Sequence, residues 1–440
     1  MTGTAPGGAG EDRETMTRWW TGMAIVPCVL AASAAAAVTG APHGVQVASR
    51  AAVAARPGAK AGSTARPKAA PTRASGVAAP EQPPWTEPRG LYVMAADTGT
   101  ELVSRDADRQ WPPASMTKMM TVLLALEQVH ANKHSLTEPV HVSARSASQG
   151  GSQVFLKAGE VFPLGELLGA MMIPSANDAA VAVAEHLAGS VEAFVRRMNG
   201  RARAMGLTRT VYQTPNGLPP PPGGQPDLTT AHDLARVARE LLKYPEALGW
   251  SGTKETTFRD GAFVMKNTNR LLTRFAGATG LKTGHTWAAG FSITATATRG
   301  DLSLIAVVLG APSREGSFGT ASNLLGDAFE RYRLLVAARP GVSVGTVPVA
   351  GGVEGSVKAM PAGDLKLVVP RADERQLVIE PRVPRELPAP VTAGQSVGDL
   401  VVRHGDREIG RVALVSDGAV DQAGWLAWLW PSGRPAQAAR

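Results

Sequence analysis

Hydrophobic residues follow a helical pattern in the first half of the chain. An apolar run from Met116 to Leu126 begins directly after the segment 111–114, which contains two prolines. It predicts a buried helix, because proline is tolerated in the first turn of a helix but not in its interior. A second apolar segment, residues 164–174, precedes an alanine-rich helical pattern at 179–185. These two segments predict consecutive helices that meet at a corner.

Patterns typical of strands dominate the second half. The runs 292–297 and 302–309 predict neighbouring strands of an antiparallel sheet. After residue 340 the chain changes to short alternating runs separated by glycine and proline, and these predict a small all-β domain. The runs of this domain lie at 365–369, 377–379, 397–402 and 412–415.

The N-terminal region differs in composition from the rest. Arg18 is followed by an apolar, alanine-rich segment from Trp19 to Val38, which predicts a secretory signal or a membrane anchor within residues 1–41. Small residues near its end favour cleavage, although about 20 apolar residues could also span a bilayer. Residues 42–85 are rich in Ala, Pro, Gly and Ser and predict a disordered linker.

Charge and cysteine content exclude several classes of function. The formal net charge is +8 over 440 residues, but residues 1–80 hold eight basic and three acidic residues, which leaves only a mildly basic remainder. We therefore expect no nucleic-acid partner. The only cysteine, Cys28, lies in the apolar N-terminal segment, so no disulfide framework is expected. The eight histidines show no ligand spacing, and we expect neither a metal nor another cofactor.

The first motif with chemical potential is Ser115-Met116-Thr117-Lys118. Its position near a helix N-terminus puts the Lys118 amine on the same face as the Ser115 hydroxyl. A lysine in apolar surroundings loses affinity for its proton and can then act as a base toward a serine. Alone, the motif is equally a helix cap followed by a surface lysine. The same spacing recurs from Ser251 to Lys254 in a polar, turn-like stretch, which we interpret as accidental.

Two further motifs follow at a helix corner and near a strand end. Ser175-Ala176-Asn177 lies at the predicted corner, where it can present a hydroxyl and an amide to a substrate. Lys282-Thr283-Gly284 precedes the two predicted strands. Its glycine lets a peptide backbone lie against the strand, Thr283 can bind a carboxylate, and Lys282 adds positive charge. Taken singly, these motifs could be a helix cap and an ordinary strand and turn.

The three motifs in this order resemble those of serine D-alanyl-D-alanine carboxypeptidases, the low-molecular-mass penicillin-binding proteins of the penicillin-binding protein 5 type. The resemblance covers roughly residues 88–417 and is carried by the longer phrases at 113–119, 172–180 and 280–286. It implies an α/β (α+β) β-lactamase/transpeptidase-like catalytic domain at 86–338, with an antiparallel sheet flanked by helices. A small β-rich domain at 345–418 would carry no chemistry.

The resemblance assigns roles to the residues of the first two motifs. Ser115 would be the nucleophile acylated by the carbonyl of the penultimate D-Ala, with Lys118 as its general base. Ser175 and Asn177 would relay protons and hold the substrate amide. The backbone N–H groups of Ser115 and His285 would form the oxyanion hole.

Residues of the third motif would bind the substrate. Lys282 and Thr283 would take its terminal carboxylate, next to Gly284. Asn216, in a loop that lines the site in this family, and Arg270, in a phrase upstream of the strand, are weaker matches that could be structural.

The implied reaction removes the terminal D-Ala from peptidoglycan stem pentapeptides and is blocked by β-lactams as covalent inhibitors. Class A β-lactamases carry Asp where this chain has Ala176, and residues 211–220 lack the glutamate that those enzymes need for deacylation. Fast β-lactam hydrolysis is therefore not expected. A DD-endopeptidase, a weak β-lactamase or esterase of the same fold, and a non-catalytic wall-binding or β-lactam-sensing protein remain as alternatives.

The expected location of the protein in the cell follows from the family resemblance and from the sequences of the N-terminal and C-terminal segments. We expect an exported monomer at the extracytoplasmic face of the membrane or in the cell wall. The tail at 419–440 carries three tryptophans between residues 425 and 430. They suit either contact with the membrane surface or packing onto the β-rich domain.

Overall fold

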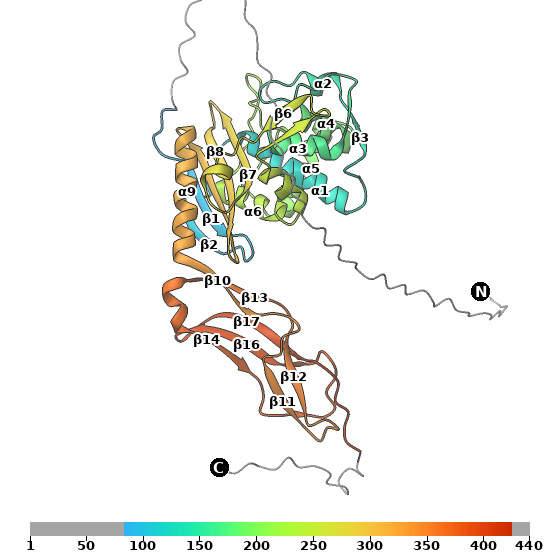
Figure 1. Cartoon of the computed structure of the whole chain (residues 1–440), viewed down its shortest axis with the longest axis vertical. Helices are drawn as coiled ribbons and strands as arrows, with labels where there is room; N and C mark the ends of the chain where they lie inside the picture. The colour runs from blue at the N-terminus through green and yellow to red at the C-terminus, as the bar shows by residue number, and fades with distance from the viewer. Residues whose placement is uncertain (1–82, 425–440) are drawn as a thin grey trace, which may run out of the picture. The chain divides into compact units, whose positions relative to one another are not determined.

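Figure 1 shows the computed structural model of the chain, which describes residues 83–424. The expected signal or anchor, the linker up to residue 82, and the tail from residue 425 on lie outside the described residues. Within residues 83–424, no helix combines the length and the hydrophobicity that crossing a membrane requires.

The centre of the first domain is a five-stranded antiparallel sheet in the order β2-β1-β9-β8-β7. Two strands precede the helical region and three follow it, so both ends of the domain meet in one sheet. The two strands predicted from their apolar runs are β8 and β9. The bounds of the strands are β1 Gly90–Ala95, β2 Glu101–Arg105, β7 Ala278–Thr286, β8 Gly290–Arg299 and β9 Leu302–Ala311.

Alternate side chains of β9 enter two separate hydrophobic cores. Ile305 and Val307 belong to the core shared with the helical region, whereas Leu304 and Ala306 belong to the core under α9 (Arg314–Arg331). Successive strand residues point to opposite faces, so a strand covered on both sides is apolar throughout. In Figure 1, α9 runs along one side of the sheet, and the helices between residues 118 and 252 lie on the opposite side.

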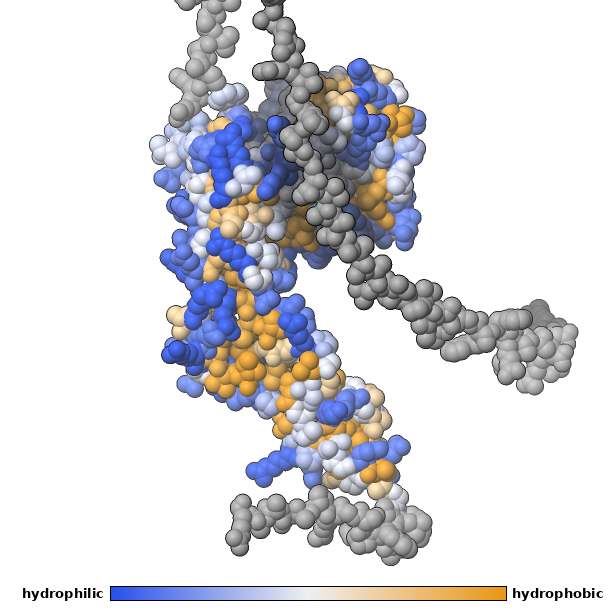
Figure 2. Space-filling model, viewed as in Figure 1, coloured by the Kyte–Doolittle hydropathy of each residue, from blue (hydrophilic) through white to orange (hydrophobic). Residues whose placement is uncertain are grey.

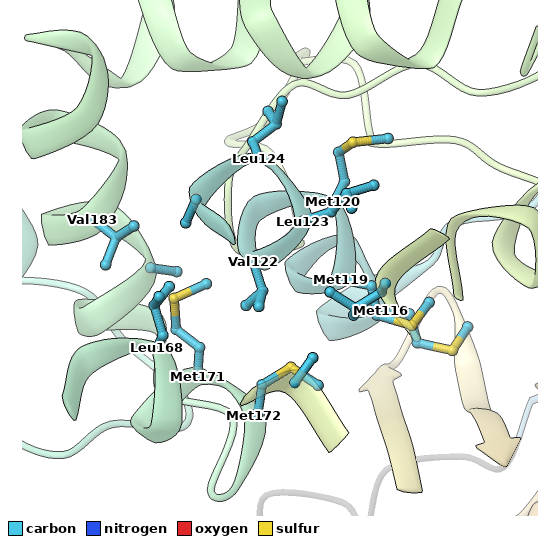
Figure 3. Packing of buried hydrophobic residues seen from close by; sticks show 14 of the residues in the cluster. Met116, Met119, Met120, Val122, Leu123, Leu124, Leu168, Met171, Met172 and Val183 are labelled. Atoms are coloured by element: carbon cyan, nitrogen blue, oxygen red, sulfur yellow. The ribbon is translucent and has the colours of Figure 1, made fainter. Parts of the chain in front are cut away.

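Helix α1 (Lys118–His130) lies inside the helical region and is buried at every position from Lys118 to Leu126. A 3-10 turn, η1 (Ala114–Thr117), leads into it, so the predicted buried helix is confirmed. Figure 3 shows methionine, leucine and valine side chains of α1 packed against those of α3 and α4. The neighbouring helices are α3 Leu164–Met172, α4 Asn177–Ala188, α5 Val191–Ala204 and α6 Ala231–Leu241.

Short elements complete this domain. Two small antiparallel sheets are formed, one by β3 and β4 and the other by β5 and β6. The bounds are α2 Ala144–Ala147, β3 Pro139–His141, β4 Val161–Pro163, α7 Pro245–Gly252, β5 Glu255–Phe258, β6 Phe263–Lys266 and α8 Leu271–Arg274.

The C-terminal part is all β apart from the 3-10 turn η2 (Arg371–Gln376), as its sequence pattern predicts. One sheet has the order β14-β16-β17-β12-β11-β15, and β10 pairs with β13. Orange areas in Figure 2 mark apolar residues at the surface of this region, where Val378 and Ile379 of β14 are about half exposed. The bounds are β10 Tyr332–Ala338, β11 Gly345–Ala350, β12 Ser356–Pro361, β13 Leu365–Pro370, β14 Leu377–Arg382, β15 Leu387–Pro388, β16 Ser396–His404 and β17 Arg407–Ser416.

Candidate active site

Ser115 and Lys118 meet where η1 passes into α1. Ser115 lies in the 3-10 turn and Lys118 is the first residue of α1. Residues three apart are aligned in a 3-10 turn, and Lys118 Nζ lies 3.0 Å from Ser115 Oγ. The contact expected from the spacing of the motif is therefore present.

The Lys118 amine is fully buried among three oxygen atoms. Its Nζ donates to Asn177 Oδ1 at 2.6 Å and to the backbone oxygen of Asn216 at 2.8 Å, and the third oxygen is Ser115 Oγ. Burial, and then the charge of Lys282, lower the pKa of Lys118 well below its ordinary value. A neutral amine has two N–H donors and one lone pair. Because the amide and backbone oxygens only accept, the lone pair is matched to the Ser115 hydroxyl.

The second motif holds the opposite side of this amine. Asn177 begins α4, and its Nδ2 donates to the backbone oxygen of Gly150 at 2.7 Å, which fixes Oδ1 toward Lys118. Ser175 has a left-handed backbone with φ of 73°. Its buried Oγ has no hydrogen-bond partner among residues 83–424. A strained residue with an unpaired hydroxyl is typical of a site that binds a ligand.

The third motif brings the edge strand β7 against the turn that holds Ser115. A side chain added at Gly284 would place its Cβ 2.6 Å from the backbone oxygen of Pro113 and 3.2 Å from the backbone N of Ser115. Only glycine permits this approach. The backbone of residues 284–285 thereby lies next to the Ser115 N–H, as an oxyanion hole requires.

Lys282 and Thr283 differ in burial and in their partners. Lys282 is 1% exposed, and burial lowers its pKa to about 7. Its Nζ donates to the backbone oxygen of Thr283 at 3.0 Å. The Thr283 hydroxyl, at the cavity wall, donates to Thr268 Oγ1 at 2.7 Å. Burial therefore lowers the fraction of Lys282 that is protonated, and an anion bound beside it would raise that fraction.

A buried carboxylate fixes the loop that supplies the Asn216 backbone oxygen. Asp227 accepts hydrogen bonds from the Thr117 hydroxyl at 3.0 Å, from the backbone N–H groups of Gln213 and Thr214, and from the Thr214 hydroxyl. Burial raises the pKa of Asp227, and these hydrogen bonds oppose that effect. The loop passes so close to the nucleophile that a Cβ at Gly217 would lie 1.9 Å from the backbone oxygen of Ala114.

Residues of all three motifs border a cavity of about 200 Å³ between the turn at Ser115, β7 and the start of α9. The His285 ring stacks on Phe291 with 4.0 Å between ring centroids. Burial, and then the charge of Arg314, lower the pKa of His285, so the imidazole is neutral at neutral pH. A larger hollow of about 600 Å³ beside α5 contains no motif residue. The predicted members of the cavity wall are Ser115, Ser175, Thr283, Gly284 and His285.

Comparison with known families shows which family the chain belongs to. A sequence profile of the D-alanyl-D-alanine carboxypeptidases, Peptidase S11, matches residues 78–313. The chain belongs to this family. A second profile, for the C-terminal domain of penicillin-binding protein 5, matches residues 336–422. The chain is thus a serine-type DD-carboxypeptidase of the penicillin-binding protein 5 type, and its predicted fold class is confirmed.

Relatives of this DD-carboxypeptidase match most of its length. It is 32% identical to the D-alanyl-D-alanine carboxypeptidase DacF of Bacillus subtilis over 347 residues, which are 78% of this chain and 88% of the relative. DacC of Escherichia coli is 33% identical over 361 residues, covering 79% and 88%. The solved structure of penicillin-binding protein 5 from Haemophilus influenzae is 27% identical, with a TM-score of 0.66, and covers 78% of this chain and 100% of that one.

The two weaker candidates occupy different places in this DD-carboxypeptidase. Asn216 is buried and reaches Lys118 through its backbone oxygen, while its side chain bonds to Gln149 Oε1 and to the backbone N–H of Leu218. Arg270 is exposed and donates to Glu315 Oε1 at 2.6 Å. It is absent from the cavity wall within residues 83–424, so the structure does not bring Arg270 together with the other candidates.

Several residues of the candidate site were missed by sequence reasoning. Thr268, Arg314, Ser317 and Phe318 line the cavity. Arg314 is the first residue of α9, where its guanidinium and the positive end of the helix dipole both favour an anion. Only the fold brings α9 to the cavity. The phrase around Arg270 pointed to the correct segment, since Thr268 lies two residues earlier.

The second Ser-x-x-Lys sequence lies outside this site, but our interpretation of its local structure was wrong. Ser251 is in helix α7, not in a turn, and it is fully buried. The ring of Trp250 packs over Gly169 of α3, so tertiary packing outweighs the helix-weakening glycines of this stretch. The Ser251 hydroxyl lies 3.3 Å from the backbone oxygens of Leu248 and Thr279, and its role is structural.

Proposed function

We propose that this enzyme removes the terminal D-Ala from peptidoglycan stem pentapeptides through an acyl-enzyme on Ser115. The observation that carries the proposal is the 3.0 Å contact between Ser115 Oγ and the buried Lys118 amine at the wall of the cavity. With Lys118 neutral, Ser115 Oγ attacks the carbonyl carbon of the penultimate D-Ala and its proton passes to Lys118 Nζ. The N–H groups of Ser115 and His285 stabilise the negative oxygen that forms.

Breakdown of the tetrahedral intermediate requires a proton on the leaving D-Ala nitrogen. We assign its delivery to Lys118 through the Ser175 hydroxyl, because this buried hydroxyl has no other partner among residues 83–424. Asn177 holds Lys118 through Oδ1, and the Nδ2 hydrogen that is not bonded to Gly150 is assigned to the substrate amide. Water then attacks the ester and gives a proton to Lys118. As the ester bond breaks, Lys118 returns a proton to Ser115 Oγ, and the shortened peptide leaves.

The substrate carboxylate occupies the part of the cavity next to α9. Thr283, Thr268 and Ser317 supply hydroxyl donors there, and Arg314 supplies a permanent positive charge. Lys282 gains a proton as the carboxylate binds, since an adjacent anion raises its lowered pKa. A free terminal carboxylate is thereby distinguished from an internal peptide bond, which favours carboxypeptidase over endopeptidase action.

We expect slow release of β-lactams because two buried carboxylates, on Asp227 and Asp178, are occupied by hydrogen bonds within the fold. Both oxygens of Asp227 bind the 213–214 loop segment and Thr117. Asp178 accepts from the backbone N–H groups of Val154 and Leu156. Because both carboxylates are bonded within the fold, we assign neither of them to the activation of a deacylating water. We infer that a penicillin acylates Ser115 and remains bound as a covalent inhibitor.

The proposed reaction takes place outside the cytoplasm, where peptidoglycan is assembled. The apolar segment 19–38 supports export, and the tryptophans at 425, 428 and 430 support contact of the tail with the membrane surface. We propose that the enzyme acts there as a monomer.

Release of D-alanine tests the proposed function directly. The full chain is incubated with diacyl-Lys-D-Ala-D-Ala and, separately, with a purified cross-linked muropeptide dimer. We expect free D-alanine from the first and no monomeric muropeptides from the second. Cleavage of the dimer with no release of D-alanine from the tripeptide would replace the carboxypeptidase assignment by an endopeptidase.

Arg314 provides a sharper test of how the carboxylate is bound. We expect Arg314→Gln to lower kcat/KM for the tripeptide by about ten- to hundredfold, the usual effect of losing one charge-assisted hydrogen bond. Parent and variant should differ much less on the same peptide with a C-terminal amide. Arg270→Gln is the matched control, because Arg270 pairs with Glu315 outside the cavity wall. Equal losses on acid and amide substrates would contradict this assignment.

A further inference from the structure

Two histidines and a glutamate converge near the ends of α1 and α4 that lie opposite the active-site motifs. Glu138 Oε1 lies 2.6 Å from His134 Nδ1 and 2.5 Å from His186 Nε2. The three ligand atoms all lie within 4.8 Å of one another, and the two imidazole rings are 5.6 Å apart between centroids. We propose that His134, Glu138 and His186 form a binding site for Zn²⁺.

The donor set matches the preferences of zinc. Two imidazole nitrogens and one carboxylate oxygen are borderline ligands that Zn²⁺ binds readily, and a water molecule can complete a tetrahedron. The three side chains are 22–24% exposed, so the cluster is open to solvent on one side. Ca²⁺ and Mg²⁺ prefer sites built entirely from oxygen ligands and do not fit this set.

Hydrogen bonds hold the side chain and the backbone of Glu138 in the orientation that a metal site needs. Its second carboxylate oxygen accepts the N–H of Ser135 at 3.0 Å, which leaves Oε1 to face the two histidines. The backbone oxygen of Glu138 accepts the N–H of Leu164, and that of Leu136 accepts the N–H of Gly165, so the segment is anchored to the start of α3. Hydrogen bonds of this kind orient metal ligands and raise metal affinity.

Only small side-chain movements are needed to admit the ion. Bonds of about 2.0–2.1 Å in a tetrahedron place neighbouring ligand atoms about 3.3 Å apart. The two contacts to Glu138 Oε1 therefore open by less than an ångström as the ion replaces the shared hydrogen bonds. His186 sits on a rigid helix, so the loop residue His134 is free to make most of the adjustment.

Binding at this place would brace the fold and leave catalysis unchanged. His134 and Glu138 follow the C-terminal end of α1, and His186 lies in the last turn of α4. These helices carry Lys118 and Asn177 at their opposite ends. Nine residues separate Asn177 from His186, or about 13 Å along the helix axis. An ion at the cluster ties the two helices together without reaching the reacting groups.

The experiment measures zinc binding to the full chain after treatment with EDTA and dialysis. Titration with Zn²⁺ is expected to show one site, and saturating Zn²⁺ to raise Tm by a few degrees. Mg²⁺ should do neither. Release of D-alanine should be the same with and without zinc.

Variants connect the binding to the three side chains. Glu138→Gln and His186→Gln should each weaken Zn²⁺ affinity by at least about tenfold and remove the rise in Tm. His130→Gln and His232→Gln are matched controls, since each of these histidines faces a single carboxylate, on Glu246 and Asp108 respectively. Retained D-alanine release verifies that each variant is folded.

Three outcomes would overturn the proposal. The first is that the parent binds no stoichiometric zinc. The second is that both cluster variants keep the zinc affinity of the parent. The third is that the two control variants lose as much zinc affinity as the cluster variants. Cobalt provides a measurement that needs no variant. Co²⁺ bound at the cluster should give the visible absorption of a four-coordinate ion, and titration with Zn²⁺ should abolish it.

Discussion

Replacement of Ser115 by alanine is expected to abolish D-alanine release and covalent labelling by a fluorescent penicillin. The loss in kcat should be at least about 10⁴-fold, because binding and the oxyanion hole cannot replace a missing nucleophile. Matching losses with both reagents would mean that peptide and drug acylate the same oxygen. The measurement is D-alanine release together with the mass of the protein after exposure to penicillin.

Ser251→Ala is the matched control because Ser251 also precedes a lysine by three positions. Its hydroxyl lies against two backbone oxygens inside the fold, so its loss should cost about 1 kcal/mol of stability and no activity. A penicillin adduct on Ser115→Ala would show that another residue is the nucleophile. Loss of labelling in the Ser251 variant, with Tm unchanged, would contradict the structural role of Ser251.

Removal of the Lys118 amine should be nearly as damaging. We expect Lys118→Met to lower the rate of acylation by at least about a thousandfold, since general-base catalysis is lost and two buried oxygens lose their donor. The rate is measured as the second-order constant for penicillin labelling. Lys254→Met, in the second Ser-x-x-Lys sequence, is the control and should match the parent.

The pH dependence of the parent distinguishes a base from a purely structural lysine. Because the neutral amine is the active form, kcat/KM should fall as pH decreases through the lowered pKa of Lys118. Lys282 acts in the opposite direction. Its protonated form binds the carboxylate, so kcat/KM should also fall as pH rises above its pKa of about 7. A parent profile that stays flat on the acid side would show that Lys118 is not the base.

Sequence reasoning reached the main elements because their patterns depend on local burial. Helix α1 and strand β9 are apolar on nearly every face, and β8 alternates apolar residues with Ser and Thr. The three motifs lie close together, as their order suggested, and the comparisons confirm the family. Local pattern failed at Ser251, where the Trp250 ring packed over Gly169 stabilises a helix that the glycines alone would not.

The remaining site residues could not be predicted because their roles depend on contacts distant in sequence. Asp227 bonds to Thr117 across 110 positions, and His186 reaches Glu138 across 48. No spacing rule connects such pairs. Burial also changes the chemistry that residue type alone suggests, since Lys282 was expected to add positive charge and burial lowers its pKa to about 7.

The two glycines that press on the nucleophile's peptide restrict how this enzyme can diverge. At Gly217 and Gly284 any side chain would collide with backbone atoms of Pro113 or Ala114, which cannot move without displacing Ser115. Substitutions at these two positions therefore cannot protect the serine from an antibiotic without also disturbing it. Exposed positions next to the cavity wall, such as Trp287, accept substitution more easily. Trp287 is 58% exposed and its ring centroid lies 5.6 Å from that of His285. Descendants of this protein can therefore change their choice of substrate far more easily than their chemistry.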